Sequence, residues 1–171
     1  ETAIEDPVEF IHKDKQSIVS HREVGKQTKS FSNALRAALR EDPDVILVGE
    51  LRDLETIGLA LTAAETGHLV FGTWHTSGAP NTINRIIDVF PPEQQSQIRA
   101  QIAESLKMVV TQKLFKKKDN SGRIGAFEIM VCNAPIKNLI REAKIHQIPT
   151  VMQTAQREGM IQMEKSIEDL I

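Results

Sequence analysis

The chain has 171 residues, of which 40% are hydrophobic and 26% are charged, and its formal net charge is −2. This length can bury one sizeable core, so we expect one domain or a domain with a small appendage. The charge balance argues against a general nucleic-acid or lipid surface, and the single cysteine excludes an intrachain disulfide and a four-cysteine zinc site.

The first twenty residues are typical of short strands. The first strand is expected to end in two acids, Glu5 and Asp6, because Pro7 cannot donate to a β-ladder. Two more strands are expected over 8–11 and 17–20, before a polar loop that runs to Lys29. The chain opens on what looks like the end of a strand, so we expect it to be a fragment that lacks an N-terminal part.

An amphipathic helix is predicted after Ser30, which is a suitable N-cap. Apolar residues follow the i, i+3, i+4, i+7, i+8 rule at positions 31, 34, 35, 38 and 39. Arg36 and Arg40 are four residues apart, so they are expected to project together from the flank of this face. Asp42 and Pro43 end the helix.

Residues 44–50 read Asp-Val-Ile-Leu-Val-Gly-Glu and predict a strand that is buried on both faces of a parallel sheet. Glu50 then follows the C-terminal end of the strand, which is the edge where open α/β sheets bind ligands. A carboxylate at that edge is suited to hold magnesium or an attacking water. The alternative is that Glu50 caps the helix that follows.

A second helix is expected from Asp53 as N-cap to Gly67 as C′ residue, followed by a buried strand over 69–74 with His68 and His75 at its ends. Strand, helix, strand, helix, strand is the pattern of a parallel sheet with right-handed crossovers. Seven positions at ~3.3 Å separate the two histidines by roughly 23 Å, so they cannot ligate one metal. We expect His75 at the functional edge and His68 in a structural role or a subunit contact.

Strands that end at Glu5, Glu50 and His75 would bring three polar groups to one edge of the sheet if the strands are neighbours. Phosphoryl transfer needs such a set: one acid for Mg²⁺, another to orient the attacking water, and a neutral donor near the γ-phosphate. However, the chain contains no G-x-x-x-x-G-K-[S/T] loop. We therefore do not expect strong ATP binding by this chain alone.

Later residues predict helices after Gly78 and after the Pro91-Pro92 break, then an antiparallel hairpin added to the sheet from 108–115 and 123–131. Three short helical segments follow Asn133. The expected fold class is α/β, with residues 1–131 forming the mostly parallel, helix-flanked sheet and residues 132–171 a small helical C-terminal subdomain.

Three segments resemble motifs of the secretion-ATPase superfamily that powers type IV pili and type II secretion. Residues 3–9 resemble its aspartate box, residues 42–53 its atypical Walker B segment, and residues 66–76 its histidine box. Residues 134–142 are similar to the C-terminal motif of its pilus-retraction, twitching-motility branch. The matching positions of that partner motif are Ile136, Asn138, Leu139, Ile140, Arg141 and Glu142.

The resemblance implies a RecA-like core without its P-loop part, which in the parent protein is an ATPase acting as a homo-hexameric motor on ATP and Mg²⁺. It implies a place at the cytoplasmic face of the bacterial inner membrane, docked on the pilus platform protein. We expect no nucleic-acid partner, because the charge balance is acidic and the sequence has no basic stripe with aromatic residues. Glu50 would act at Mg²⁺, through water, and Glu5 is a second candidate for the general base. His68 and His75 would be the histidine-box residues, and Arg36 and Arg40 would face a neighbouring subunit's nucleotide.

Departures from the family pattern keep alternatives open. Pro135 and Lys137 replace an alanine and an arginine of the retraction motif, and lysine cannot reproduce the bidentate fork of arginine. Without a P-loop, the chain could be a non-catalytic oligomerisation or docking module. An ATPase of the assembly or secretion branch is a further alternative, although the lone Cys132 does not match the four-cysteine zinc insertion frequent there. The acidic balance disfavours a nucleic-acid translocase.

Overall fold

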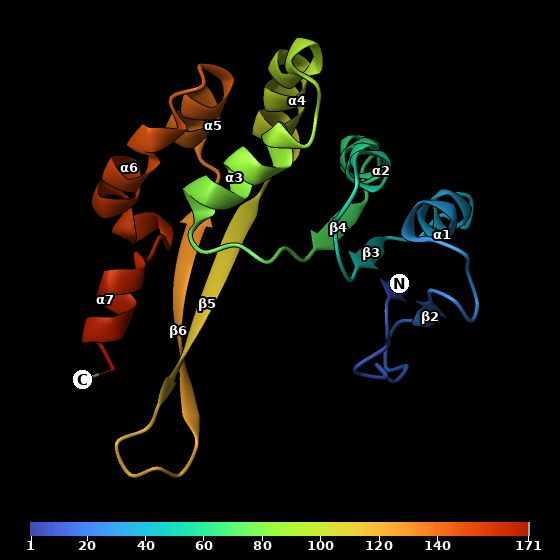
Figure 1. Ribbon diagram of the computed structural model, residues 1–171, viewed down its shortest axis with the longest axis horizontal. Helices are drawn as coiled ribbons and strands as arrows, with labels where there is room; N and C mark the ends of the chain where they lie inside the picture. The colour runs from blue at the N-terminus through green and yellow to red at the C-terminus, as the bar shows by residue number, and fades with distance from the viewer. Residues whose placement is uncertain (171) are drawn as a thin grey trace. The chain divides into compact units, whose positions relative to one another are not determined.

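The computed structural model describes residues 1–170, and the chain forms two units, Glu1–His75 and a second that begins at Thr76 (Figure 1). The first unit contains a four-stranded sheet in the order β2-β1-β3-β4, with every pair parallel. The strands are β1 (Thr2–Glu5), β2 (Ser20–Glu23), β3 (Val45–Val48) and β4 (Leu69–Gly72). The predicted parallel α/β architecture is thus confirmed.

Helices α1 (Phe31–Ala38) and α2 (Leu54–Glu65) lie on the same face of this sheet (Figure 1). Both begin where the sequence predicts, at N-caps Ser30 and Asp53. The core between helices and sheet is apolar throughout; its buried members are Ile4, Ala34, Leu35, Ile46, Val48, Ala60 and Ala63. The alternation along β1 and β3 directs Ile4, Ile46 and Val48 toward the helices.

Several local predictions for the first unit were wrong. Residues 8–11 form no strand, and Phe10 and Ile11 are exposed. The second strand starts at Ser20, the last residue of its predicted range, and runs into the segment expected to be loop. Strands β3 and β4 are not buried on both faces: Val45 and Leu47 are half-buried, and two β4 side chains are exposed. The reason is that both described helices cover one face only.

The second unit combines helices with a hairpin (Figure 1). Helices α3 (Ala79–Asp88) and α4 (Pro92–Ser105) meet at the predicted double proline, and β5 (Met108–Lys116) pairs with β6 (Arg123–Val131) in an antiparallel register. This hairpin is a separate two-stranded sheet and is not added to the parallel one as predicted.

The chain after the hairpin is helical, as predicted. It forms α5 (Ala134–Arg141), α6 (Ile148–Thr154) and α7 (Met163–Glu168), with 3-10 turns at Ile145–Gln147 and Gln156–Glu158. Helix α5 packs against α4, and α7 packs against β6, so the end of the chain belongs to the second unit. Across residues 1–170, no helix combines the length and hydrophobicity that a bilayer span requires.

Candidate functional site

The candidate site lies at the C-terminal edge of the parallel sheet, where β1, β3 and β4 end side by side. In the register Ile4 pairs with Val48, and Val48 pairs with Gly72. Glu5 therefore ends β1 beside the Gly49–Glu50 segment, and the residues that lead to His75 continue from β4 on the other side. The structure brings together the three strand ends that the sequence placed at one edge.

Gly49 makes the close approach of β1 and β3 possible. Its amide donates to the carbonyl oxygen of Ile4 at 2.7 Å. A Cβ at this position would lie 3.0 Å from that oxygen and 3.2 Å from the Cα of Glu5, which is tighter than ordinary packing allows. The hydroxyl of Thr73 donates to the carbonyl oxygen of Gly49 from the β4 side. The backbone around Glu50 is therefore fixed from both neighbouring strands.

Glu50 lies between the side chains of Arg52 and His75. Its Oε2 pairs with Arg52, and its Oε1 lies 3.6 Å from Nε2 of His75. The hydrogen bond from Arg52 holds the pKa of Glu50 below its ordinary value and outweighs the opposite effect of desolvation. The side chain of Glu50 is 20% exposed, whereas His75 is 85% exposed. Glu50 is consequently an ionised and restrained carboxylate, and His75 is open to a ligand.

Glu5 is more enclosed than Glu50, with a side chain that is 13% exposed. Nδ1 of His21, on the neighbouring strand β2, lies 3.8 Å from Glu5 Oε1. The sequence offered no signal for His21, because β2 lies at the edge of the sheet and its sequence, Ser-His-Arg-Glu, has no apolar pattern. Arg52 was also missed as a site residue, although its position two residues after a strand-end carboxylate could have indicated it.

His68 lies at the other end of β4, away from this edge. Its Nδ1 is 3.0 Å from the carbonyl oxygen of Ala63 and 3.2 Å from the hydroxyl of Thr66, so the ring closes the C-terminal turn of α2. A histidine near a helix C-terminus interacts favourably with the last carbonyl groups. The structure thus separates the two histidines of the 66–76 segment as their spacing predicts.

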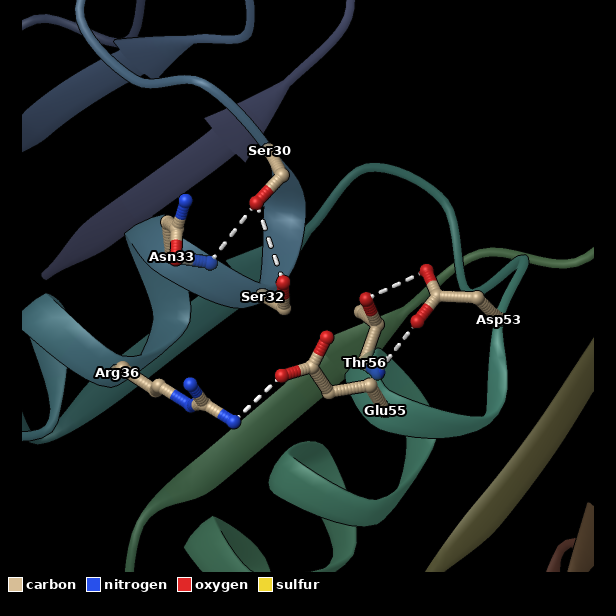
Figure 2. A network of polar contacts seen from close by, with 7 residues as sticks. All are labelled: Ser30, Ser32, Asn33, Arg36, Asp53, Glu55 and Thr56. Atoms are coloured by element: carbon tan, nitrogen blue, oxygen red, sulfur yellow. Dashed lines mark hydrogen bonds and ion pairs between the residues drawn. The ribbon is translucent and has the colours of Figure 1, made fainter.

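The two arginines predicted to project together are in different settings. Arg36 on α1 pairs with Glu55 in the first turn of α2 at 2.5 Å, as Figure 2 shows. Arg40 lies beyond the end of α1 and is exposed. Figure 2 also shows the cap of α2, where Asp53 accepts hydrogen bonds from the backbone and hydroxyl groups of Thr56 at 2.8 and 2.7 Å.

The segment that resembles the retraction motif forms α5 and divides into two faces. Ile136 and Ile140 are fully buried, and Leu139 is half-buried. On the outer side, Arg141 pairs with Glu104 of α4 and donates to the side chain of Asn138 at 3.0 Å. The other outer members are also held by ion pairs: Lys137 lies 4.0 Å from Glu104, and Glu142 lies 2.7 Å from Lys144.

Metal binding by protein ligands alone is not supported. Within residues 1–170, no group of three or more His, Cys, Asp or Glu side chains could hold a metal ion. Mg²⁺, however, commonly keeps several waters and uses one or two carboxylates together with substrate phosphates. The ionised Glu50 at the sheet edge fits that second arrangement.

The sequence of this chain is similar to one protein family and to several known proteins. The model of a family described as "Type II/IV secretion system protein" matches residues 2–121. A "Twitching motility protein" of Neisseria gonorrhoeae is 56% identical over 168 residues, which is 98% of this chain and 45% of the relative. The "Type IV pilus retractation ATPase PilT" of Pseudomonas aeruginosa is 54% identical over 168 residues, or 98% and 48%.

A solved structure has the same fold. It is the pilus retraction motor PilT with bound ADP, which superposes with a TM-score of 0.84 at 49% identity and covers 98% of this chain and 51% of its own. The chain therefore spans about half the length of the relatives that it matches.

Proposed function

The chain belongs to the family of type II/IV secretion system proteins, and from this premise we propose that it is part of an ATP-hydrolysing motor for type IV pilus retraction and twitching motility. Two relatives that match 98% of this chain carry the names of that activity. The observation that carries the proposal is the position of Glu5, Glu50 and His75 on three adjacent parallel strand ends. Ligands of open α/β sheets bind at this edge.

Each residue at the edge has a task in this proposal. Glu50, kept ionised by Arg52, would hold Mg²⁺ through water or orient the attacking water, and Glu5 is the second carboxylate available as general base. His75, which is exposed beside Glu50, donates to the γ-phosphate. A bound Mg²⁺ would neutralise the charge that develops on the transferred phosphoryl group. His68 has a structural role: its ring contacts the last turn of α2, just before β4 begins.

The motor is proposed to be a homo-hexameric ring. Exposed arginines on one subunit can stabilise the transition-state charge at a neighbour's nucleotide, and Arg36 and Arg40 are both exposed. Arg36 must share or leave its ion pair with Glu55 to act in this way. We place the ring at the cytoplasmic face of the inner membrane, bound to the pilus platform protein through the outer residues of α5.

Substitution of Glu50 tests the proposal directly. In the full-length protein that contains this chain, Glu50→Gln should lower ATP turnover by about 10²-fold or more, since removal of a positioned acid or base costs that much. ATP binding should persist, because the substitution keeps the shape of the side chain. A matched control is Glu93→Gln, which alters an exposed carboxylate in the first turn of α4. Unchanged hydrolysis by Glu50→Gln would refute the assignment.

One observation favours a second function. The chain contains no G-x-x-x-x-G-K-[S/T] loop to hold the β- and γ-phosphates, so the 171 residues alone could serve as a non-catalytic oligomerisation or docking module. Size-exclusion chromatography with light scattering separates the two functions in part. A stable ring formed by these residues alone would favour the module.

A further inference from the structure

Two buried polar atoms of the first unit face each other without a hydrogen-bond partner. They are Oε1 of Glu5 and Nδ1 of His21, 3.8 Å apart. Their side chains are only 13% and 19% exposed. In the register His21 pairs with Ala3, so His21 and Glu5 are diagonal neighbours on the sheet face opposite α1 and α2. Buried polar atoms are normally paired, and an unpaired one requires a physical explanation.

The other ring nitrogen of His21 determines what Nδ1 can do. Nε2 lies 3.1 Å from the backbone carbonyl oxygen of His12, and because a carbonyl oxygen only accepts, Nε2 must carry a hydrogen. In a neutral ring Nδ1 would then present a lone pair to the carboxylate of Glu5. Two acceptors this close in a buried position repel each other, so the pair requires one proton between them.

The remaining groups on this face do not supply that proton. The ring of His12 stacks on the ring of His21 with centroids 5.8 Å apart and an interplanar angle of 6°, so it covers the ring face and not the Nδ1 edge. Glu23, two residues further along β2, is paired with Lys26 at 2.7 Å. Asp14 accepts from the backbone amide of Val19. None of these three side chains offers a hydrogen to Oε1 of Glu5 or to Nδ1 of His21.

We propose that His21 is a positioning residue for Glu5: its ring, protonated at Nδ1, forms an ion pair with Oε1 of Glu5 across 3.8 Å, and this contact orients the carboxylate so that Oε2 receives the proton of the attacking water. The inference rests on the proposed role of Glu5 in ATP hydrolysis. The productive form is imidazolium with carboxylate, because a protonated Glu5 could not act as a base. The backbone carbonyl group of His12 holds the ring of His21 through Nε2, and the ring in turn restrains the carboxylate of Glu5.

The test uses the two amide substitutes for histidine in the full-length protein. The amide nitrogen of asparagine can occupy the position of Nδ1, and that of glutamine the position of Nε2. His21→Asn should keep kcat for ATP hydrolysis within about threefold of the wild-type value, whereas His21→Gln and His21→Ala should lower it about tenfold or more, with KM changed less than about twofold. Glu23→Gln, on the same strand and face, is the matched control and should leave kcat unchanged.

A role in folding alone predicts a different result. A His21 needed only to hold the 6–19 segment acts through Nε2, so His21→Gln would then retain activity and His21→Asn would not. That outcome, or wild-type kcat in His21→Ala, would overturn the proposal. Full hydrolysis by Glu5→Gln would instead refute the proposed role of Glu5 itself, which keeps the two failures distinguishable.

A spectroscopic measurement covers the case in which a His21 variant fails to fold. Solid-state ¹⁵N NMR of the histidine-labelled full-length protein, with His21 assigned by difference from His21→Asn or His21→Gln, reports the Nδ1 environment. Glu5→Gln should shift the Nδ1 signal of His21, and Glu23→Gln should leave it in place. An Nδ1 signal that does not respond to Glu5→Gln would overturn the contact.

Discussion

Gly49 is the residue at which backbone geometry limits the candidate site most directly. An added methyl group would meet the carbonyl oxygen of Ile4 and the Cα of Glu5, both of which are backbone atoms that cannot rotate away. Gly49→Ala should therefore lower the free energy of unfolding by about 1–3 kcal/mol, as overpacking does. It should also separate the strand ends and reduce ATP hydrolysis in the full-length protein.

Gly58 provides the matched control for this substitution. It lies within α2, and a Cβ there would meet nothing within 4 Å. Gly58→Ala should raise the free energy of unfolding by about 0.5–1 kcal/mol, because glycine is unfavourable inside a helix. Urea unfolding of both variants would measure the contrast, and equal effects would contradict the close approach at Gly49.

The ion pair between Arg52 and Glu50 should make stability depend on acidity. The pKa of Glu50 is held below its ordinary value of 4.5, first by the Arg52 hydrogen bond. A depressed carboxyl pKa stabilises the fold above the unfolded value, and this contribution disappears as the pH falls through the folded value. In Arg52→Gln the pKa of Glu50 should rise, so that less stability is lost on acidification below about pH 4.5.

Urea midpoints at neutral pH and near pH 3 measure this difference between wild-type and variant chains. Arg52→Lys is the control, because it keeps the charge but loses the planar donor fork. It should retain part of the acid sensitivity. Identical pH dependence in the wild type and Arg52→Gln would show that the pair does not persist in solution.

Among the elements, α2 depends most clearly on its first turn. Asp53 accepts from the backbone amide and the hydroxyl group of Thr56, which is fully buried. Asp53→Ala should lower the free energy of unfolding by about 1 kcal/mol, within the 0.5–2 range for lost N-caps. Asp53→Asn should retain most of the stability that Asp53→Ala loses, because asparagine caps a helix as well as aspartate does. Thermal unfolding of the two variants is the measurement.

The sequence correctly predicted the elements whose ends are marked by residues close by in the chain. The caps at Ser30 and Asp53, the double proline before α4 and the turn of the hairpin each act within a few residues, so neighbouring positions are sufficient to predict them. Strand β2 has no such signal, since its position depends on pairing with β1 across the intervening segment. The apolar residues of 8–11 suggested a strand, but within residues 1–170 no strand pairs with them.

The candidate site was predictable only in part. The strand-end position of Glu5, Glu50 and His75 follows from the parallel order, which the alternation of strands and helices predicts. Arg52 and His21, in contrast, belong to the site because their side chains lie beside Glu50 and Glu5 in the folded chain. Nothing in the spacing of residues indicates that His21 lies beside Glu5, because that contact depends on the register of an edge strand.

At the scale of the whole molecule, apolar side chains lie on surfaces that the described residues leave uncovered. On β4, an edge strand of the parallel sheet, Leu69 is 48% and Phe71 is 53% exposed. Uncovered apolar strands at a sheet edge promote association. The 171-residue chain alone should therefore bind a hydrophobic dye and self-associate as its concentration rises.

The double variant Leu69→Lys/Phe71→Lys should reduce both effects, because two charges would then line the edge strand. Ile18→Lys is the matched control: Ile18 is exposed too, but it lies in the segment before β2 and outside the edge strand. Dye fluorescence and sedimentation velocity would measure the outcome. An equal response to both substitutions would assign the association to hydrophobicity in general and not to β4.

The bond from the Gly49 amide to the Ile4 carbonyl oxygen also makes the site observable without any ligand. That amide is protected from hydrogen exchange only while β1 remains docked on β3, and the bond joins Ile4 and Gly49, the residues directly before the carboxylates of Glu5 and Glu50 proposed for hydrolysis. Its deuterium uptake would therefore report how often the edge opens. Compared between the free chain and the proposed ring, this single rate would show whether assembly tightens the site before nucleotide arrives.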